Sequence, residues 1–341
     1  MSKRISERIY SGCYHPMLAV PSGVTSSGKV KYRFLCRFDK TDVANAKIID
    51  PRSVVVPCGK CIGCRLQKSR QWADRMMLEL ACSEKAIFLT LTYNNEHCPP
   101  ASFDDDDNVL TYTLDKRDCQ LFLKRLRDFF SDRKIRFFLS GEYGPQTQRP
   151  HYHAIIFGLG LDDFPDKVEK GRNELDQVWY KSDTMERIWK NGFALFSDVS
   201  WKTCAYVARY VQKKLYGEPA LQYAIRNCTP EFSLMSRKPG IGAAYLKQHP
   251  DCLDYASIVL SDSDGSLKIP LPKYYLEKMN DEKSVLYDPE KYAIMKKQRM
   301  ELADDAMTIR LMQTNLSLLD FLEGQEKKKL DAAKKLKRGD L

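Results

Sequence analysis

Histidine is scarce in this chain, and long apolar runs are absent from it. Only five of the 341 residues are histidine, and two of those five stand two positions apart. No stretch approaches the roughly 18 consecutive apolar residues that cross a bilayer, and no apolar run follows the polar N-terminal residues as in a secretion signal. We therefore expect no membrane partner, and we expect the protein to stay in the compartment where it is made.

The cysteine count argues against a disulfide framework. The chain has eleven cysteines, an odd number, and disulfides are typical of exported proteins rather than of chains without a secretion signal. Free thiols or a metal site are the better interpretations. The net charge of +10 favours a polyanionic partner such as nucleic acid, although many proteins carry such a charge without binding one.

Three regions are predicted along the chain. Residues 1–65 are irregular and end in a cysteine cluster, residues 66–245 mix strand and helix patterns, and residues 246–341 form a connector and a basic, helix-rich tail. Within the central region, Asp115 is an expected helix N-cap, and residues 99–109 form an acidic loop that should lie away from DNA. The predicted strands are 86–93, 135–142 and 150–158, and the predicted helices are 65–83, 116–130, 177–190 and 203–216.

The two close histidines indicate a metal site. His151 and His153 are two residues apart in a predicted strand, so their side chains point to the same face, about 7 Å apart. Neutral imidazole is a common ligand of divalent metals. The alternative is an exposed strand face with two polar residues. The apolar residues 154–157 argue for a buried strand, where imidazoles without partners are rare.

Glu142 is the expected third ligand of this metal. If residues 135–142 and 150–158 pair as a hairpin with Glu142 opposite His151, the two side chains share a face within bridging distance. One carboxylate and two imidazoles leave coordination positions for phosphate oxygens and water. Such a site suits Mg²⁺ or Mn²⁺ acting as a Lewis acid on a scissile phosphate.

Two tyrosines stand four residues apart in the predicted helix 203–216. Tyr206 and Tyr210 therefore share one helix face, and Lys213 follows on the same side. Tyrosine acts as a nucleophile when its phenol is deprotonated or its oxyanion is stabilised, and a lysine and a metal-bound phosphate would both help. The alternative is a half-buried aromatic stripe, because a chance pair is not rare among 18 tyrosines.

A second metal site is predicted at the end of the N-terminal segment. Cys58, Cys61 and Cys64 form two overlapping C-x₂-C pairs, a spacing that binds Zn²⁺ when a fourth ligand is present. The candidates for that ligand are Cys13, His15 and Cys36. An iron–sulfur site lacks a clear fourth cysteine, and three reduced thiols in a turn are the remaining alternative.

Several basic side chains near these motifs are expected to contact DNA phosphates. They are Arg65, Lys68, Arg70, Arg149, Lys213, Lys214, Arg237 and Lys238. Gly240 and Gly242 would let the backbone approach a phosphate closely. Tyr143 and Tyr152 are candidates for stacking on unpaired bases.

In their order along the chain, these motifs resemble the rolling-circle replication initiators of the HUH superfamily, named for its His-hydrophobic-His motif. Residues 149–158 match that motif with Tyr152 in the middle, residues 88–93 resemble the first strand motif, and Tyr206, Tyr210 and Lys213 match the tyrosine motif. The similarity is closer still to the initiators of microviruses of the gokushovirus type. That similarity rests on residues 56–61, 140–144 and 238–242 and covers roughly residues 54–245.

The resemblance implies an α+β fold, a five-stranded antiparallel sheet with flanking helices. It implies that His151 and His153 hold the metal and that Tyr206 and Tyr210 are nucleophiles. One tyrosine would cut the single-stranded origin, keeping the 5′ phosphate and leaving a 3′-hydroxyl for a host polymerase. The second tyrosine would later cut the regenerated origin, and the displaced circle would be religated. The implied partners are the origin DNA and the host replicative helicase and polymerase, in the host bacterial cytoplasm.

Other functions stay open at this point. A plasmid-type initiator or relaxase shares the motif, but a relaxase usually has a third clustered histidine, and a single-tyrosine transposase would not need two tyrosines. A zinc-stabilised, non-catalytic nucleic-acid-binding protein would explain the cysteines and the charge, but leaves the histidine pair without a purpose. A metallohydrolase with His-x-His-x-Asp-His lacks its Asp-His pair here, where residues 155 and 156 are isoleucine.

Overall fold

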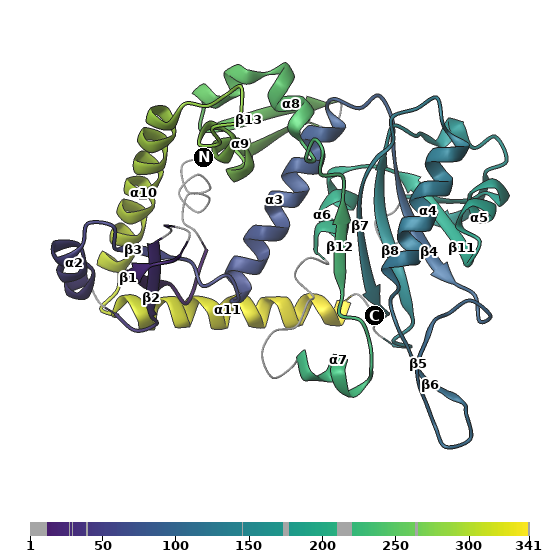
Figure 1. Ribbon diagram of the computed structural model, residues 1–341, viewed down its shortest axis with the longest axis horizontal. Coiled ribbons are helices and arrows are strands. Elements are labelled where there is room, and N and C mark those ends of the chain that lie inside the picture. Colours follow the sequence, from purple (N-terminus) through teal and green to yellow (C-terminus); the bar gives the residue numbers. More distant parts are fainter. Residues whose placement is uncertain are drawn as a thin grey trace. The chain divides into compact units, whose positions relative to one another are not determined.

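The structure is a computed structural model that describes residues 12–26, 28, 30–38, 40–144, 146–172, 177–209, 220–262 and 265–339, without the side chains of residues 40, 262 and 333–339. It divides into two compact units (Figure 1). The first comprises Met1–Gln67 and Asp288–Leu341, and the second comprises Lys68–Tyr287. Residues 246–287 thus group with the central region and the later tail with the N-terminal segment. The three regions drawn from the sequence stay a prediction about domains.

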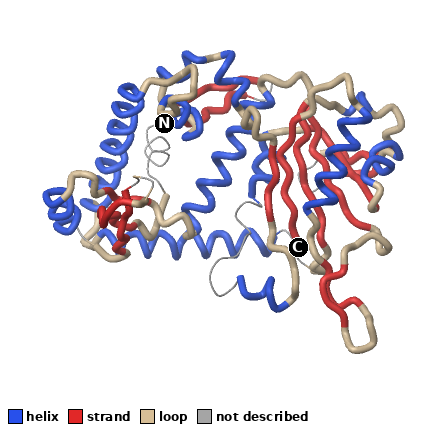
Figure 2. Tube along the Cα trace, in the orientation of Figure 1, coloured by secondary structure: helices blue, strands red, loops and turns tan. Residues whose placement is uncertain are grey.

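A seven-stranded antiparallel sheet forms the second unit, as the red strands of Figure 2 show. Its order is β12 (Phe232–Met235), β7 (Arg136–Tyr143), β8 (Pro150–Phe157), β4 (Ala86–Tyr93), β11 (Gly192–Asp198), β10 (Val178–Lys181) and β9 (Val168–Arg172). The α+β class is confirmed, but the prediction of five strands is wrong. Two extra strands arise where a polar insertion and the start of a helix were expected.

The segment around β10 shows why that expectation failed. Val178, Trp179 and Tyr180 are β-branched or aromatic and favour a strand. Only the following residues are helical, in α5 (Asp183–Trp189). There the Ser182 hydroxyl accepts a hydrogen bond from the Met185 N–H at 3.2 Å, so α5 begins at its own N-cap.

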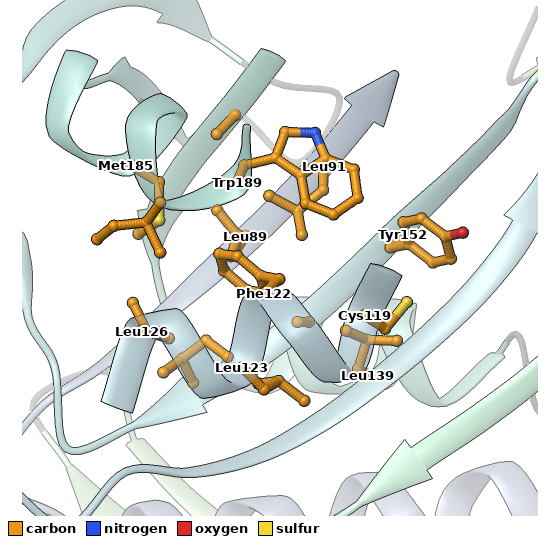
Figure 3. Packing of buried hydrophobic residues seen from close by; sticks show 14 of the residues in the cluster. Leu89, Leu91, Cys119, Phe122, Leu123, Leu126, Leu139, Tyr152, Met185 and Trp189 are labelled. Carbon is orange, nitrogen blue, oxygen red and sulfur yellow. The ribbon is translucent and has the colours of Figure 1, made fainter. Parts of the chain in front are cut away.

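Helices cover both faces of the sheet. On one face lie α4 (Lys116–Phe129), capped by the Asp115 carboxylate as predicted, and α5. Figure 3 shows this core, in which Phe122, Trp189 and Leu91 pack together without solvent exposure. On the other face lie α6 (Trp201–Arg209) and the later part of α3 (Ile62–Leu80), which pack on Phe88, Phe138 and Ile155.

Because strand side chains alternate, the two faces carry different residues. Leu89, Leu91 and Ala154 point to the α4 face. Phe88 and Ile155, which pair directly across β4 and β8, point to the α6 face. We call this second side the site face, since His153 and His151 follow Ile155 on it at every second position.

Shorter elements complete the second unit. They are the hairpin β5 (Pro100–Phe103) and β6 (Val109–Tyr112), the hairpin β13 (Ser257–Asp262) and β14 (Gly265–Pro270), and the helices α7 (Leu221–Ile225), α8 (Ala243–Gln248) and α9 (Lys273–Met279), with single 3₁₀ turns at Leu161–Asp163 and Pro250–Asp254. The predicted acidic loop is thus the tip of the β5–β6 hairpin.

The first unit is more regular than its sequence suggested. It contains an antiparallel sheet of β2 (Val30–Leu35), β1 (Met17–Val24) and β3 (Val54–Val56), with α2 (Lys40–Ile49) beside it in sequence. Leu18, Phe38 and Ala46 form its small core. The prediction of an irregular segment is therefore wrong for these residues. The predicted helical tail is confirmed as α10 (Pro289–Met312) and α11 (Leu318–Gly339).

Candidate functional site

The β7–β8 hairpin has the register that the sequence suggested. Glu142 pairs directly with His151, and Ser140 pairs with His153. On the other side of β8, Thr90 of β4 pairs with His153. Directly paired residues of antiparallel strands point to the same face. The carboxylate and both imidazoles are therefore brought together on the site face.

The three side chains converge on one point. The Glu142 Oε1 atom lies 2.8 Å from His151 Nε2 and 3.0 Å from His153 Nε2. All three candidate ligand atoms lie within 4.8 Å of one another. Glu142 and His153 are buried, and His151 is half-buried, so the group is open to a ligand on the His151 side only. This geometry can hold a divalent metal ion.

The second nitrogen of each ring is also held in place. His151 Nδ1 lies 3.1 Å from the Arg149 carbonyl oxygen, which can only accept a hydrogen bond, so Nδ1 is the protonated nitrogen. His153 Nδ1 lies 2.9 Å from the Thr90 hydroxyl. Partners of this kind fix ring orientation and leave the Nε2 lone pair for a metal. Thr90 was missed by the sequence reasoning, because its role depends on the β4–β8 register.

Tyr206 packs directly on the metal-ligand candidates. It lies on α6, and its ring centroid is 5.2 Å from that of His153 and 5.8 Å from that of Phe88, edge to face in both cases. The ring is half-buried. The Arg209 guanidinium, one turn later, lies 5.8 Å from the Tyr206 ring centre. The other predicted residues of this motif, Tyr210 and Lys213, lie outside the described residues, as does Lys214.

The cysteine cluster gathers four sulfurs in the first unit. Cys13 joins Cys58, Cys61 and Cys64, with all four sulfurs within 4.8 Å of one another. Of the other fourth-ligand candidates, His15 pairs with Glu326, and Cys36 is exposed outside the cluster.

Backbone N–H groups point at these sulfurs. Cys61 Sγ accepts from the N–H groups of Tyr14 and Cys64, both at 3.4 Å, and Cys58 Sγ accepts from Cys61 at 3.3 Å. A hydrogen bond with the Cys13 thiol, together with these N–H donors, lowers the pKa of Cys61 to about 4. Such donors favour a thiolate, which is the form that binds a metal.

The predicted DNA contacts have different surroundings. Arg237 and Lys238 are exposed and free to meet a phosphate, as are Lys68 and Arg70, although Arg70 Nε is 3.6 Å from the Asp74 carboxylate. Arg149 is half-buried and donates to the Tyr93 carbonyl at 2.9 Å, so part of its role is to hold the end of β4. Arg65 is half-buried in the first unit.

Two tyrosines proposed for base stacking are structural. Tyr152 is completely buried on the α4 face, where its hydroxyl donates to the Asp115 carbonyl at 3.0 Å and burial raises its pKa. Its prediction is wrong, because the alternation that exposes His151 and His153 buries the residue between them. Tyr143 is half-buried, with its hydroxyl bound to the Thr229 carbonyl at 2.7 Å.

The two glycines proposed to approach a phosphate are also used internally. Gly242 has φ +80° and donates its N–H to the Glu79 carboxylate at 2.7 Å, and Gly240 accepts from Arg136 at 2.9 Å. Arg136 also pairs with Glu79. The segment around residues 238–242 thus fastens α3 to β7, and the prediction that its glycines serve DNA is not supported by these contacts.

Comparison with known proteins agrees with the site. A family model for replication-associated proteins of the ORF2 type matches residues 86–215, which include the strands that carry Glu142, His151 and His153 and the helix that carries Tyr206. The replication-associated protein ORF2 of Spiroplasma virus 4 is 32% identical over 294 residues, 83% of this chain and 85% of that protein. The chain belongs to this family of viral replication-associated proteins.

Two further relatives extend the similarity. The replication-associated protein VP4 of Bdellovibrio phage phiMH2K is 32% identical over 266 residues, 74% of this chain and 76% of that protein. The replication-associated protein ORF4 of Chlamydia phage 1 is 30% identical over 265 residues, 75% of this chain and 61% of that protein. The predicted relation to microvirus initiators is confirmed. No solved structure matches the chain, and no helix in its described residues is long and apolar enough to cross a membrane.

Proposed function

We propose that this protein initiates replication by nicking single-stranded DNA with a tyrosine. The observation that carries the proposal is the meeting of Glu142, His151 and His153 at one point with the Tyr206 ring packed on His153. A carboxylate, two imidazoles and a phenol on one face of a sheet match the donor set and the nucleophile that phosphodiester cleavage needs. Membership of a viral replication-associated family supports this use of the site.

The residues present fit a divalent cation. Two neutral Nε2 atoms and one carboxylate oxygen make a mixed set that suits Mg²⁺ or Mn²⁺, and Mn²⁺ tolerates imidazole better than Mg²⁺ does. The Thr90 hydroxyl and the Arg149 carbonyl orient the two rings. When bound, the cation would polarise the scissile phosphate and stabilise the charge that develops on it.

Tyr206 is the nucleophile that the described residues support. Its phenol gives up a proton to solvent as its oxygen bonds to phosphorus. The bond between phosphorus and the 3′ oxygen breaks, and that oxygen leaves as a 3′-hydroxyl after taking a proton. The DNA 5′ end stays on the enzyme as a phosphotyrosine. Tyr210, four residues later in the sequence, is the proposed second nucleophile, with Lys213 as an electrostatic aid.

The wider proposal follows the same family pattern. The sheet and its helices would be an endonuclease fold of the HUH type. Arg149, Arg237, Lys238 and Lys214 would contact phosphates of the origin strand, and the 3′-hydroxyl would serve a host polymerase working with a host helicase. These events would take place in the cytoplasm of the host bacterium, and the second tyrosine would let the displaced circle be religated.

We also propose that Cys13, Cys58, Cys61 and Cys64 bind one Zn²⁺. Four sulfurs within 4.8 Å of one another, with backbone N–H groups donating to them, fit a closed tetrahedral thiolate site. The ion would supply no chemistry, because four protein ligands leave no open position. Its role would be to join Cys13 to the start of α3 in a unit whose apolar core is small.

The test is cleavage of labelled single-stranded oligonucleotides that tile the viral genome, with Mg²⁺ or Mn²⁺ present. We expect one oligonucleotide to give a covalent protein–DNA band that chelation abolishes. His153→Ala should reduce the rate by at least about a hundredfold, in line with the loss of a catalytic group. The matched control is His97→Ala, since His97 is exposed and bonds to Asn94.

The outcomes separate two functions. Equal activity of the His153→Ala and His97→Ala proteins would remove the metal from the mechanism. Tight binding of an origin oligonucleotide, with no covalent product under any metal, would favour a zinc-stabilised binding protein instead.

A further inference from the structure

Phe193 is an aromatic side chain left uncovered on the site face. It lies in β11, where its neighbour Ala194 and the later Phe196 are completely buried in the core on the α4 face. Phe193 points the other way, and 57% of it is exposed. Single exposed apolar side chains are common in proteins, so exposure by itself carries no function. Its position does.

The strand registers place Phe193 in one row with the metal-ligand candidates. Glu142 pairs with His151, His151 pairs with Thr92, and Thr92 pairs with Phe193. Each pairing keeps the side chains on the same face. The row therefore crosses β7, β8, β4 and β11, and Phe193 ends it, two strand spacings or about 10 Å from His151.

This distance suits a nucleotide next to the scissile phosphate. With one phosphate held at His151 and His153, the strand must leave the site across the face of the sheet. Thr92, which lies between His151 and Phe193 in the row, is short, so it leaves room above the sheet. An aromatic ring at the end of such a row is a platform on which an unpaired base can lie flat.

We propose that Phe193 stacks on an unpaired base that flanks the cut phosphate and so positions the DNA strand. The proposal rests on the proposed nicking function for the place of the phosphate. Stacking is tolerant of sequence because every base has an aromatic face. Phe193 is thus a positioning residue that acts on substrate binding, while bond breaking is left to the tyrosine and the metal.

The first experiment measures binding of labelled oligothymidylate by fluorescence anisotropy with Mn²⁺ present. We expect Phe193→Ala to weaken binding about tenfold, in the lower part of the range for one base–aromatic stack. Phe193→Trp should bind at least as well as the original chain, and Phe193→Leu, which keeps apolar bulk without a ring, should bind as poorly as Phe193→Ala. The matched control is Phe129→Ala, because Phe129 is also 57% exposed but lies on α4, at the opposite face.

The second experiment uses the oligonucleotide that the protein cuts, with an abasic site at each position around the nick in turn. At one flanking position the abasic site should weaken the original chain about tenfold and leave Phe193→Ala unchanged, since the two changes remove the same stack. At saturating DNA, Phe193→Ala should form the covalent adduct at the original rate.

These results keep the proposal apart from the nicking function. Binding by Phe193→Ala equal to that of the original chain, or abasic sites that weaken both proteins alike at every position, would overturn the stacking role. If no oligonucleotide is cut by the original chain, the nicking function fails, and the oligothymidylate series still decides whether Phe193 binds DNA.

Discussion

At the scale of single residues, the site depends on groups that hold the two imidazoles. His151 and His153 turn Nε2 toward Glu142 because their Nδ1 atoms are engaged by the Arg149 carbonyl and the Thr90 hydroxyl. The ring orientation is therefore built by the neighbouring strand β4 as well as by the hairpin. A metal site of this kind should be sensitive to residues that never touch the ion.

Thr90→Val tests this dependence. Valine keeps the shape of threonine and removes the hydroxyl, so His153 loses the partner of Nδ1. We expect Mn²⁺ affinity to fall about 10- to 100-fold, as measured by calorimetric titration of the purified protein. Thr92→Val is the control, because Thr92 lies in the same strand and on the same face, while the hydroxyl that holds the His153 ring is that of Thr90. Unchanged affinity in Thr90→Val would show that Nδ1 is held by something else.

At the scale of elements, a buried ion pair fastens α3 to the sheet. Arg136 at the start of β7 pairs with Glu79 near the end of α3, and Glu79 also accepts the N–H of Gly242. Glu79 is almost completely buried. Removing one partner of a buried pair leaves the other charge without compensation.

Glu79→Ala should therefore lower the free energy of unfolding by about 3–5 kcal/mol, measured by urea denaturation. Glu277→Ala is the matched control, because Glu277 pairs with Lys273 on an exposed face of α9. The loss there should stay below about 1 kcal/mol. Similar losses in both variants would mean that the Glu79 pair is not the fastening between α3 and β7.

The sequence predicted the elements that form the site better than those at the edges. The strands 86–93 and 150–158 and the hairpin register follow from dense apolar runs and from a short connection, which leave few alternatives. Asp115 as an N-cap follows from local chemistry. The strand β10 was missed because a short segment with Val178 and Trp179 becomes a strand only when the β11 edge is there to pair with it.

Side-chain roles followed the same rule. Glu142 could be proposed from the hairpin alone, because its pairing with His151 is local. Thr90, Phe193 and Cys13 could not be selected from the sequence, since their places depend on contacts between segments far apart in the chain. Tyr152 was misjudged because alternation along β8 buries it between two histidines that face the other way.

At the scale of the whole molecule, charge should govern the salt dependence of DNA binding. The net charge is +10, and Arg237 and Lys238 are exposed. Changing both to glutamine should reduce the slope of log affinity against log salt by about 0.7 for each lost phosphate contact on single strands. Lys124→Gln is the control, because Lys124 is exposed on α4, on the opposite face of the sheet. A slope that both proteins share would place the phosphate contacts elsewhere.

The cysteine site should matter for stability and not for bond breaking. We expect one Zn²⁺ per chain by native mass spectrometry, and none in Cys61→Ser. Loss of a ligand that binds only the folded form costs about 4 kcal/mol when the free ion is on the order of 1,000 Kd. Thermal melting with and without a strong chelator measures this loss. A chain that carries no zinc and melts at the same temperature with chelator would contradict the site.

The account as a whole depends on the identity of the nucleophile. The most direct measurement compares covalent adduct formation by the original chain, Tyr206→Phe, Tyr210→Phe and the double variant on the oligonucleotide that the original chain cuts. The account predicts an adduct that needs metal, persists at a lower rate in each single variant and is absent from the double variant. An adduct of undiminished yield in the double variant would contradict it and would assign the covalent bond to another residue.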